Sequence, residues 1–190
     1  MRLHSKSVEE TEALGATLAS HLHSGSIVLL AGDLGAGKTQ FVKGLARALG
    51  VAEHITSPTF NLMVEHATPT GTLRHFDLYR LERAADLDDI DYFGLLEDDA
   101  VSVVEWGDKF ACALPRDYLL VDCALVPGLP DERLIELSAH GPKSEKLLAA
   151  WAHAASRQAP EEQRPARRQA PEERGRLGEH PPPEEQSHDA

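Results

Sequence analysis

The chain has 190 residues and a formal net charge of −12, from 19 Lys and Arg against 31 Asp and Glu. This length suits a single domain with a sizeable hydrophobic core. The acidic balance argues against a broad nucleic-acid interface, because such a surface usually carries the opposite sign, so any contact with nucleic acid is expected to be indirect or limited.

The first predicted element is a helix from about Val8 to His23. Ser7 and Glu10 have the spacing of a capping box, and leucines follow at helical spacing. The uniformly apolar run "SIVLLAGD" (26–33) predicts a strand covered on both faces. The segment from Lys38 to Gly50 has one apolar face and ends in glycine, which predicts a second helix.

Two strands joined by a turn are predicted next. "FNLMVEH" (60–66) and "TLRHFDLY" (72–79) flank the turn-forming sequence "TPTG" (68–71). The stretch that follows, 82–99, has eight carboxylates and one arginine. We interpret it as a solvated helical surface and loop, and the alternative is a docking face for a basic partner.

The remaining elements complete the predicted sheet. "AVSVVEW" (100–106) reads as another buried strand, and "DYLLVDCAL" (117–125) and "ERLIELSAH" (132–140) read as a closing pair. Leu147, Leu148 and Trp151 would pack a last helix onto the sheet. Helices interleaved with apolar strands predict an α/β fold with a mixed central sheet flanked by helices.

The C-terminal segment differs in composition. Residues 157–190 hold half of the 12 prolines, and Leu177 is their only large aliphatic residue. Such a segment buries too little apolar surface to offset the entropy lost on ordering, so we predict a disordered tail after a folded domain of residues 1–156.

Neither the cysteines nor the start of the chain indicates export. Cys112 and Cys123 are too far apart for a CxxC site, and no disulfide framework is suggested. The first residues lack the apolar core of a signal peptide, and the longest strongly apolar run is "IVLLAG". We therefore expect a soluble, cytoplasmic protein without a membrane association.

The sequence "GDLGAGKT", Gly32 to Thr39, has the spacing of a phosphate-binding P-loop. Its glycines let the backbone curl so that N–H groups point at phosphate oxygens. Lys38 is expected to reach the outer phosphates, and the hydroxyl of Thr39 to ligate Mg2+ at the start of a helix. A strand before this loop and a helix after it give the context that such a loop requires.

The choice of nucleotide rests on absences in the sequence. No NKxD element is present for reading guanine, so ATP is favoured. A small-molecule kinase would need a lid with several arginines, whereas the stretch after Tyr79 has Arg80 and Arg83 and is otherwise acidic.

Two carboxylates at strand ends are candidates for the metal and for placing the attacking water. Asp77 ends one apolar strand and Glu105 ends another. Taken with a P-loop, both are predicted to face Mg2+; a strand-end turn residue and a surface charge are the alternatives. His75 lies two residues before Asp77, on the same strand face, and is expected to support that carboxylate.

A third candidate element is "TSPTF", residues 56–60. Pro58 fixes a bend, so Ser57 and Thr59 are interpreted as a switch-like loop that senses the γ-phosphate, with Thr59 as a candidate catalytic residue. An ordinary turn leading into a strand is the alternative.

The motifs "GDLGAGKT", "SPTF", "HFDLYRL" and "VEW", in this order and spacing, closely resemble the bacterial TsaE (YjeE) family over residues 3 to 140. The resemblance implies a P-loop α/β domain that binds ATP and Mg2+ and hydrolyses ATP slowly when alone. It implies work with the partner proteins TsaB and TsaD in forming N6-threonylcarbamoyladenosine at position 37 of tRNAs that read codons beginning with A. The family is not thought to perform the carbamoyl transfer itself.

Site residues are carried over from the resemblance by matching motifs. Thr39 and Glu105 would hold Mg2+, and Asp77 would be the Walker-B-like carboxylate that organises the metal water or the nucleophile. Trp106 would lie beside the nucleotide. The start of the first helix, near Thr11, and a turn "PDER" that ends in Arg133 would neighbour adenine or ribose. The residues expected to cradle the phosphates are Asp33, Leu34, Gly35, Ala36, Gly37, Lys38 and Thr39.

Two rival functions stay open at this point. A small-molecule kinase would transfer phosphate to a metabolite. A nucleotide-dependent binding module would work equally well with a non-hydrolysable analogue of ATP, although a pure binder has little need of two metal-facing carboxylates.

Overall fold

The structure, a computed structural model, describes residues 1–158 and their side chains through Ala154. Within these residues the elements follow in the order β1 (Arg2–Ser5), α1 (Val8–Ala19), β2 (Ile27–Ala31), α2 (Lys38–Ala48), β3 (Met63–Thr68), β4 (Gly71–Asp77), η1 (Ala84–Ile90), α3 (Tyr92–Glu97), β5 (Val101–Glu105), η2 (Ala111–Ala113), β6 (Tyr118–Val126), β7 (Leu129–His140) and α4 (Pro142–Gln158).

One mixed sheet, with strand order β1-β7-β6-β2-β5-β4-β3, organises the domain. Its middle strands, β6, β2, β5 and β4, are parallel to one another, and the flanking pairs β3–β4, β6–β7 and β1–β7 are antiparallel. The predicted α/β class, the hairpin of β3 and β4 and the closing pair of β6 and β7 are all confirmed. Because the middle strands are parallel, their carboxyl ends meet at one edge of the sheet.

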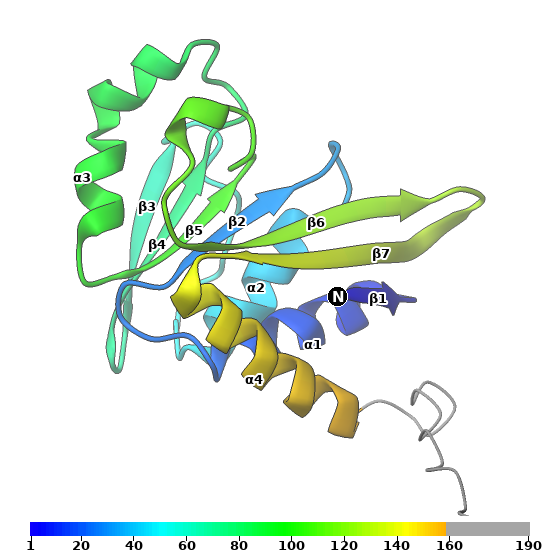
Figure 1. Cartoon of the computed structure of the whole chain (residues 1–190). Coiled ribbons are helices and arrows are strands. Elements are labelled where there is room, and N and C mark those ends of the chain that lie inside the picture. Colours follow the sequence, from blue (N-terminus) through cyan, green and yellow to red (C-terminus); the bar gives the residue numbers. More distant parts are fainter. Residues whose placement is uncertain (159–190) are drawn as a thin grey trace, which may run out of the picture. The chain divides into compact units, whose positions relative to one another are not determined.

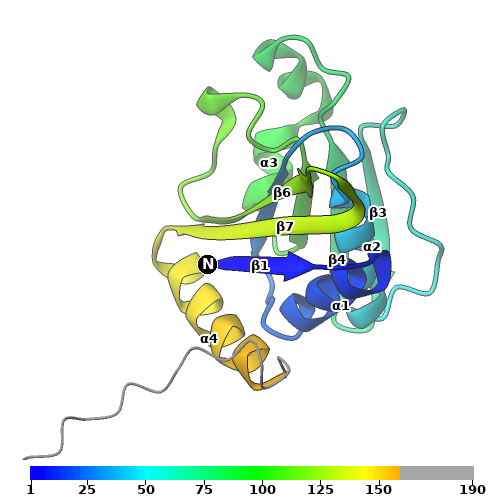
Figure 2. The same ribbon diagram turned by 90° about the vertical axis from the view of Figure 1, so that its right-hand side faces the viewer.

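Helices cover both faces of the sheet, as the two views show (Figure 1, Figure 2). The alternation along β2 explains this: Val28 and Leu30 face a core shared with α1, α2 and α4, whereas Leu29 faces a second core shared with η1 and α3. Trp151 of α4 is fully buried in the first core. Strands buried on both faces read as continuous apolar runs, which is why β2 and β5 could be predicted.

One predicted boundary was wrong at the start of the chain. The first helix ends at Ala19 rather than at His23, because the amides of His21 and Leu22 bond to the carbonyls of Leu18 and Ala19 and tighten the chain into a turn. Leu22 still packs on the core from this turn. The helical spacing of the leucines therefore continues past the end of the helix. The predicted capping box forms in part. The hydroxyl of Ser7 accepts from the amide of Glu10, as in a capping box, but the Glu10 carboxylate accepts from the amide of Lys6 and not from that of Ser7.

Strand β1 was missed, and one predicted strand begins late. β1 has only four residues, and its partner β7 lies at the other end of the domain sequence, so nothing local marks it. β3 begins at Met63, because Leu62 takes a left-handed conformation (φ 63°) and the residues before it form the loop "TSPTF".

Two further expectations concern the C-terminal half. The sequence "PDER" is not a turn: it belongs to the first residues of β7, and the turn lies just before, at Pro127 and Gly128. Helix α4 extends to Gln158, so it includes two residues that were assigned to the tail. The rest of the predicted disordered tail lies outside the described residues.

Candidate functional site

The loop "GDLGAGKT" joins the carboxyl end of β2 to the first residue of α2, at the middle of the sheet (Figure 1). Gly32 (φ 117°) and Gly37 (φ 102°) take conformations that favour glycine. Gly32 is also required by space, since a Cβ atom there would lie 2.0 Å from the carbonyl oxygen of Cys123 on β6. The loop therefore curls tightly against the neighbouring strand.

Lys38 is buried at the start of α2 and folds back over its own loop. Its Nζ atom donates to the carbonyls of Gly32 (2.6 Å) and Asp33 (2.9 Å) and lies 3.8 Å from the ring centroid of Trp106. An ammonium group has three donors, so one remains beyond these two bonds. Burial lowers the pKa of Lys38 from its ordinary value, and the negative charge of Glu105 opposes that shift.

Glu105, at the end of β5, is held through both carboxylate oxygens. The hydroxyl of Thr39 donates to Oε2 (2.9 Å), and Nε2 of His75 lies 2.9 Å from Oε1. All three side chains come from adjacent elements, α2, β5 and β4. The expectation that His75 supports Asp77 was wrong: the ring reaches diagonally across the parallel ladder to Glu105.

Asp77 lies beside Glu105, because the two are register partners on β4 and β5. Its Oδ2 accepts from the hydroxyls of Ser57 and Thr59 (2.6 Å for Thr59), and its Oδ1 accepts from the amide of Tyr79 (2.9 Å). The Ser57 and Thr59 oxygens lie 2.7 Å apart, but with both of their hydrogens donated to Asp77, neither hydroxyl has a hydrogen left to donate to the other. The structure thus ties the loop "TSPTF" to Asp77 and the P-loop threonine to Glu105.

Trp106 follows Glu105 in a left-handed conformation (φ 61°), which is uncommon for a residue other than glycine. Its ring lies under the Lys38 ammonium and 5.1 Å from the ring of Tyr79. Backbone strain of this kind is stored where the surroundings hold a side chain in place. Here it places an aromatic ring against the P-loop lysine.

Thr11 and Arg133, both predicted to neighbour the nucleotide, meet the P-loop at Gly37. A Cβ atom on Gly37 would lie 3.6 Å from Nε of Arg133 and 3.8 Å from Cγ2 of Thr11. Arg133 donates to the carbonyl of Gly35 (3.2 Å), and its own Nε is buried and finds no hydrogen-bond partner in the part of the chain that the structure describes. Thr11 is buried and bonds to Ser5 (2.8 Å). The structure brings both residues to the loop from distant elements.

Two large apolar side chains on the loops of the site are exposed. Leu34, inside the P-loop, is 73% exposed, and Phe60, in the loop "TSPTF", is 86% exposed. The guanidinium carbon of Arg80 lies 4.8 Å from the Phe60 ring centroid. Ala36, by contrast, is buried and anchors the loop in the core.

A hollow beside the P-loop adds residues that sequence reasoning missed. Asp108 and Asp122 line it together with Gly32, Trp106 and Cys123. Asp108 follows Glu105 by three residues and could have been flagged, but Asp122 reaches the site only because β6 pairs with β2. Burial raises the pKa of the Cys123 thiol to about 12, so it is not a nucleophile at neutral pH.

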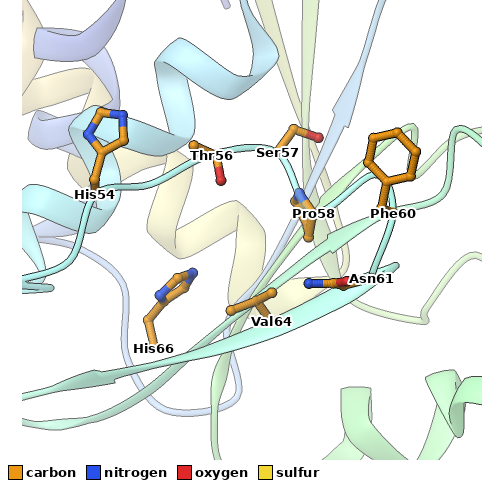
Figure 3. A pocket seen from close by; sticks show the side chains of 8 residues that line it. All are labelled: His54, Thr56, Ser57, Pro58, Phe60, Asn61, Val64 and His66. Carbon is orange, nitrogen blue, oxygen red and sulfur yellow. The ribbon is translucent and has the colours of Figure 1, made fainter.

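A second hollow lies along the loop "TSPTF" and the start of β3 (Figure 3). The rings of His54 and His66 lie at one end of it, and Phe60 and Asn61 lie at the other. His66 is buried, and its Nδ1 is 3.0 Å from an oxygen of Glu53. The hollow shares Ser57 with the hydrogen bonds around Asp77.

Residues 1–158 contain no group of three or more His, Cys, Asp or Glu side chains placed to hold a metal ion by themselves. The oxygen donors gathered at the P-loop, from Thr39, Glu105 and Asp77, nevertheless suit a hard cation such as Mg2+, which usually takes one or two protein ligands and substrate phosphates. In the same part of the chain, no helix has the length and apolar character needed to cross a membrane.

Comparisons with known proteins agree on one family. Residues 5–127 match the family model "Threonylcarbamoyl adenosine biosynthesis protein TsaE". The chain is 46% identical over 117 residues to the tRNA threonylcarbamoyladenosine biosynthesis protein TsaE of Treponema pallidum, with 61% of this chain and 85% of the relative covered. It is 36% identical over 140 residues to the TsaE protein of Bacillus subtilis, with 73% and 85% covered.

A solved structure shares the fold. The crystal structure of Bacillus subtilis YdiB superimposes with a TM-score of 0.66 at 29% sequence identity, covering 82% of this chain and 95% of that one.

Proposed function

The chain belongs to the TsaE family, and we propose that it is a Mg2+-dependent ATPase that serves the formation of N6-threonylcarbamoyladenosine at adenosine 37 of tRNAs reading codons that begin with A. The names of its relatives support the pathway. The geometry around the P-loop supports the ATPase.

The bond from Thr39 to Glu105 carries this proposal. A threonine hydroxyl has one hydrogen and two lone pairs. Because the hydrogen points to Glu105, the lone pairs stay available to a cation at the start of α2, next to a loop shaped for phosphates. Thr39, oriented by Glu105, would hold Mg2+ at this position, and the ion would supply positive charge that offsets the charge developing on the transferring group.

The other side chains divide the remaining work. Lys38 and the loop amides neutralise and orient the phosphates, while the Trp106 ring lies against the lysine ammonium. Asp77 accepts a hydrogen bond from the attacking water and orients it, and the hydroxyls of Ser57 and Thr59 hold the Asp77 carboxylate in place. Because these hydroxyls belong to the loop before β3, a change in that loop reaches the carboxylate directly.

Two exposed apolar side chains support a partner protein over the site. Leu34 and Phe60 expose most of their surface on the two loops that frame the phosphates. Exposed apolar side chains on these loops are available for contact with another protein. We assign this role to the TsaB and TsaD proteins, with contact to tRNA limited by the acidic charge of the chain, and we place the protein in the cytoplasm.

Nucleotide binding by the purified chain tests the proposal. A fluorescent ATP analogue should be displaced by ATP and much less by GTP, and EDTA should weaken its binding. Lys38→Ala should weaken ATP binding by about 10- to 100-fold, since it removes a charged donor to phosphate. Lys43→Ala, a lysine on the same helix, is the matched control and should stay within about twofold. Equal binding by the wild type and Lys38→Ala would refute the proposal.

A further inference from the structure

His75 is a fully buried histidine whose polar contact leads to the P-loop. It lies on β4, two residues before Asp77, and is 0% exposed. Its Nε2 atom is 2.9 Å from Oε1 of Glu105, which is itself 3% exposed. Its other ring nitrogen, Nδ1, is buried and has no hydrogen-bond partner among the described residues.

The bond has one direction. A carboxylate only accepts, so Nε2 carries the hydrogen and donates it to Glu105. Nδ1 is left without a partner, and a buried polar atom without a partner costs stability. A leucine or phenylalanine would fill the same space without that cost, so packing alone does not explain an imidazole at this position.

The contact continues from His75 to the P-loop. Oε1 of Glu105 accepts a hydrogen bond from Nε2 of His75, and Oε2 accepts one from the hydroxyl of Thr39. With both oxygens engaged, the carboxylate plane cannot turn without breaking a bond. The orientation of the Thr39 hydroxyl, and hence the direction of its lone pairs, then depends on His75 through Glu105.

We propose that His75 is a positioning residue, which fixes the Glu105 carboxylate so that Thr39 presents its lone pairs to the divalent cation of the bound nucleotide. This inference rests on the proposed function. His75 touches neither nucleotide nor cation; it acts through Glu105. Groups that orient metal-site ligands in this way typically change metal affinity or activity by about 10- to 100-fold when they are removed.

Three variants separate positioning from packing. His75→Leu removes the donor and keeps the position apolar. His75→Gln keeps an N–H donor that can reach Glu105. His66→Leu is the matched control, because His66 is also buried and paired with a glutamate, Glu53, but within residues 1–158 it forms no hydrogen bond to the P-loop. Thermal unfolding is measured for each to show that it folds.

The main readout is a Mg2+ titration of nucleotide binding, followed with the fluorescent ATP analogue, together with kcat and KM for ATP. His75→Leu should raise the Mg2+ concentration needed for half-saturation by about 10-fold or more and lower kcat, while nucleotide binding in EDTA stays within about twofold. His75→Gln should recover most of the Mg2+ affinity. His66→Leu should match the wild type.

The outcomes are separable. If the wild type shows no Mg2+-dependent nucleotide binding, the proposed function itself fails, and this inference fails with it. If the wild type depends on Mg2+ and His75→Leu behaves identically, only the positioning role is overturned. Should His75→Leu not fold, nitrogen NMR of the wild-type imidazole decides: the role requires the Nε2–H form, and a ring with its hydrogen on Nδ1 alone would contradict it.

Discussion

At the scale of single residues, two adjacent carboxylates have different partners. Asp77 and Glu105 are register partners on parallel strands, so their side chains leave the sheet on the same face. Glu105 is bonded to the P-loop threonine, and Asp77 is bonded to the hydroxyls of Ser57 and Thr59. Because the two carboxylates have different hydrogen-bond partners, we expect them to have different roles: Glu105 in binding the cation through Thr39, and Asp77 in positioning the attacking water.

Asp77→Ala tests this division. The change removes the acceptor for the two hydroxyls but leaves Lys38 and the P-loop intact, so the Kd for ATP should change by about threefold or less. The kcat should fall by about 100-fold, the range typical of a lost water-positioning carboxylate. Isothermal titration and steady-state hydrolysis measure the two quantities.

Asp89→Ala, an exposed carboxylate on η1, is the control and should change neither quantity. A loss of ATP binding by Asp77→Ala as large as that of Lys38→Ala would show that the two residues do not have separate roles.

At the scale of elements, glycines set how closely α1 approaches the P-loop helix. A Cβ atom on Gly15 of α1 would lie 2.1 Å from the carbonyl oxygen of Phe41, and one on Gly44 of α2 would lie 1.8 Å from that of Glu12. The two backbones therefore touch. This approach is what brings Thr11, near the start of α1, to Gly37 of the P-loop.

Gly44→Ala should destabilise the domain, although the same change at an open helix position would stabilise it by about 1 kcal/mol. The added methyl group has no room, so the helices must separate, at a cost of about 1–3 kcal/mol. For a domain of this size each kcal/mol lowers the Tm by about 2–4 °C.

Arg47→Ala, on the same helix, is the control for Gly44→Ala. Its side chain is 71% exposed and its ion pair with Glu12 lies at the surface, so the loss should be about 1 kcal/mol or less. A Tm for Gly44→Ala equal to or above that of the wild type would contradict the close helix contact.

At the scale of the whole molecule, what could be predicted depends on how local the signal is. The P-loop lies in eight consecutive residues, Gly32 to Thr39, and its strand and helix are adjacent in sequence. The bond between His75 and Glu105 spans 30 positions and requires that β4 and β5 be neighbours. Strand β1 depends on β7 in the same way, so neither could be seen before the strand order was known.

The residue types of the site were easier to predict than the hydrogen bonds between them. Asp77 and Glu105 were found because carboxylates at the ends of apolar strands meet at one edge of a parallel sheet. Which hydroxyl each one binds depends on loop paths that periodicity does not describe. Arg133 likewise reaches Gly35 from β7, across a hairpin whose turn the sequence placed a few residues too late.

ATP hydrolysis by the purified chain with Mg2+, measured alone and then with TsaB and TsaD added, tests the central claim most directly. The account predicts a weak basal rate that rises with the partners and is abolished when ATP is replaced by a non-hydrolysable analogue. No hydrolysis under either condition would favour a nucleotide-dependent binding module. A high rate for the chain alone, or a rate that rises only with a small metabolite, would contradict the account and favour a kinase.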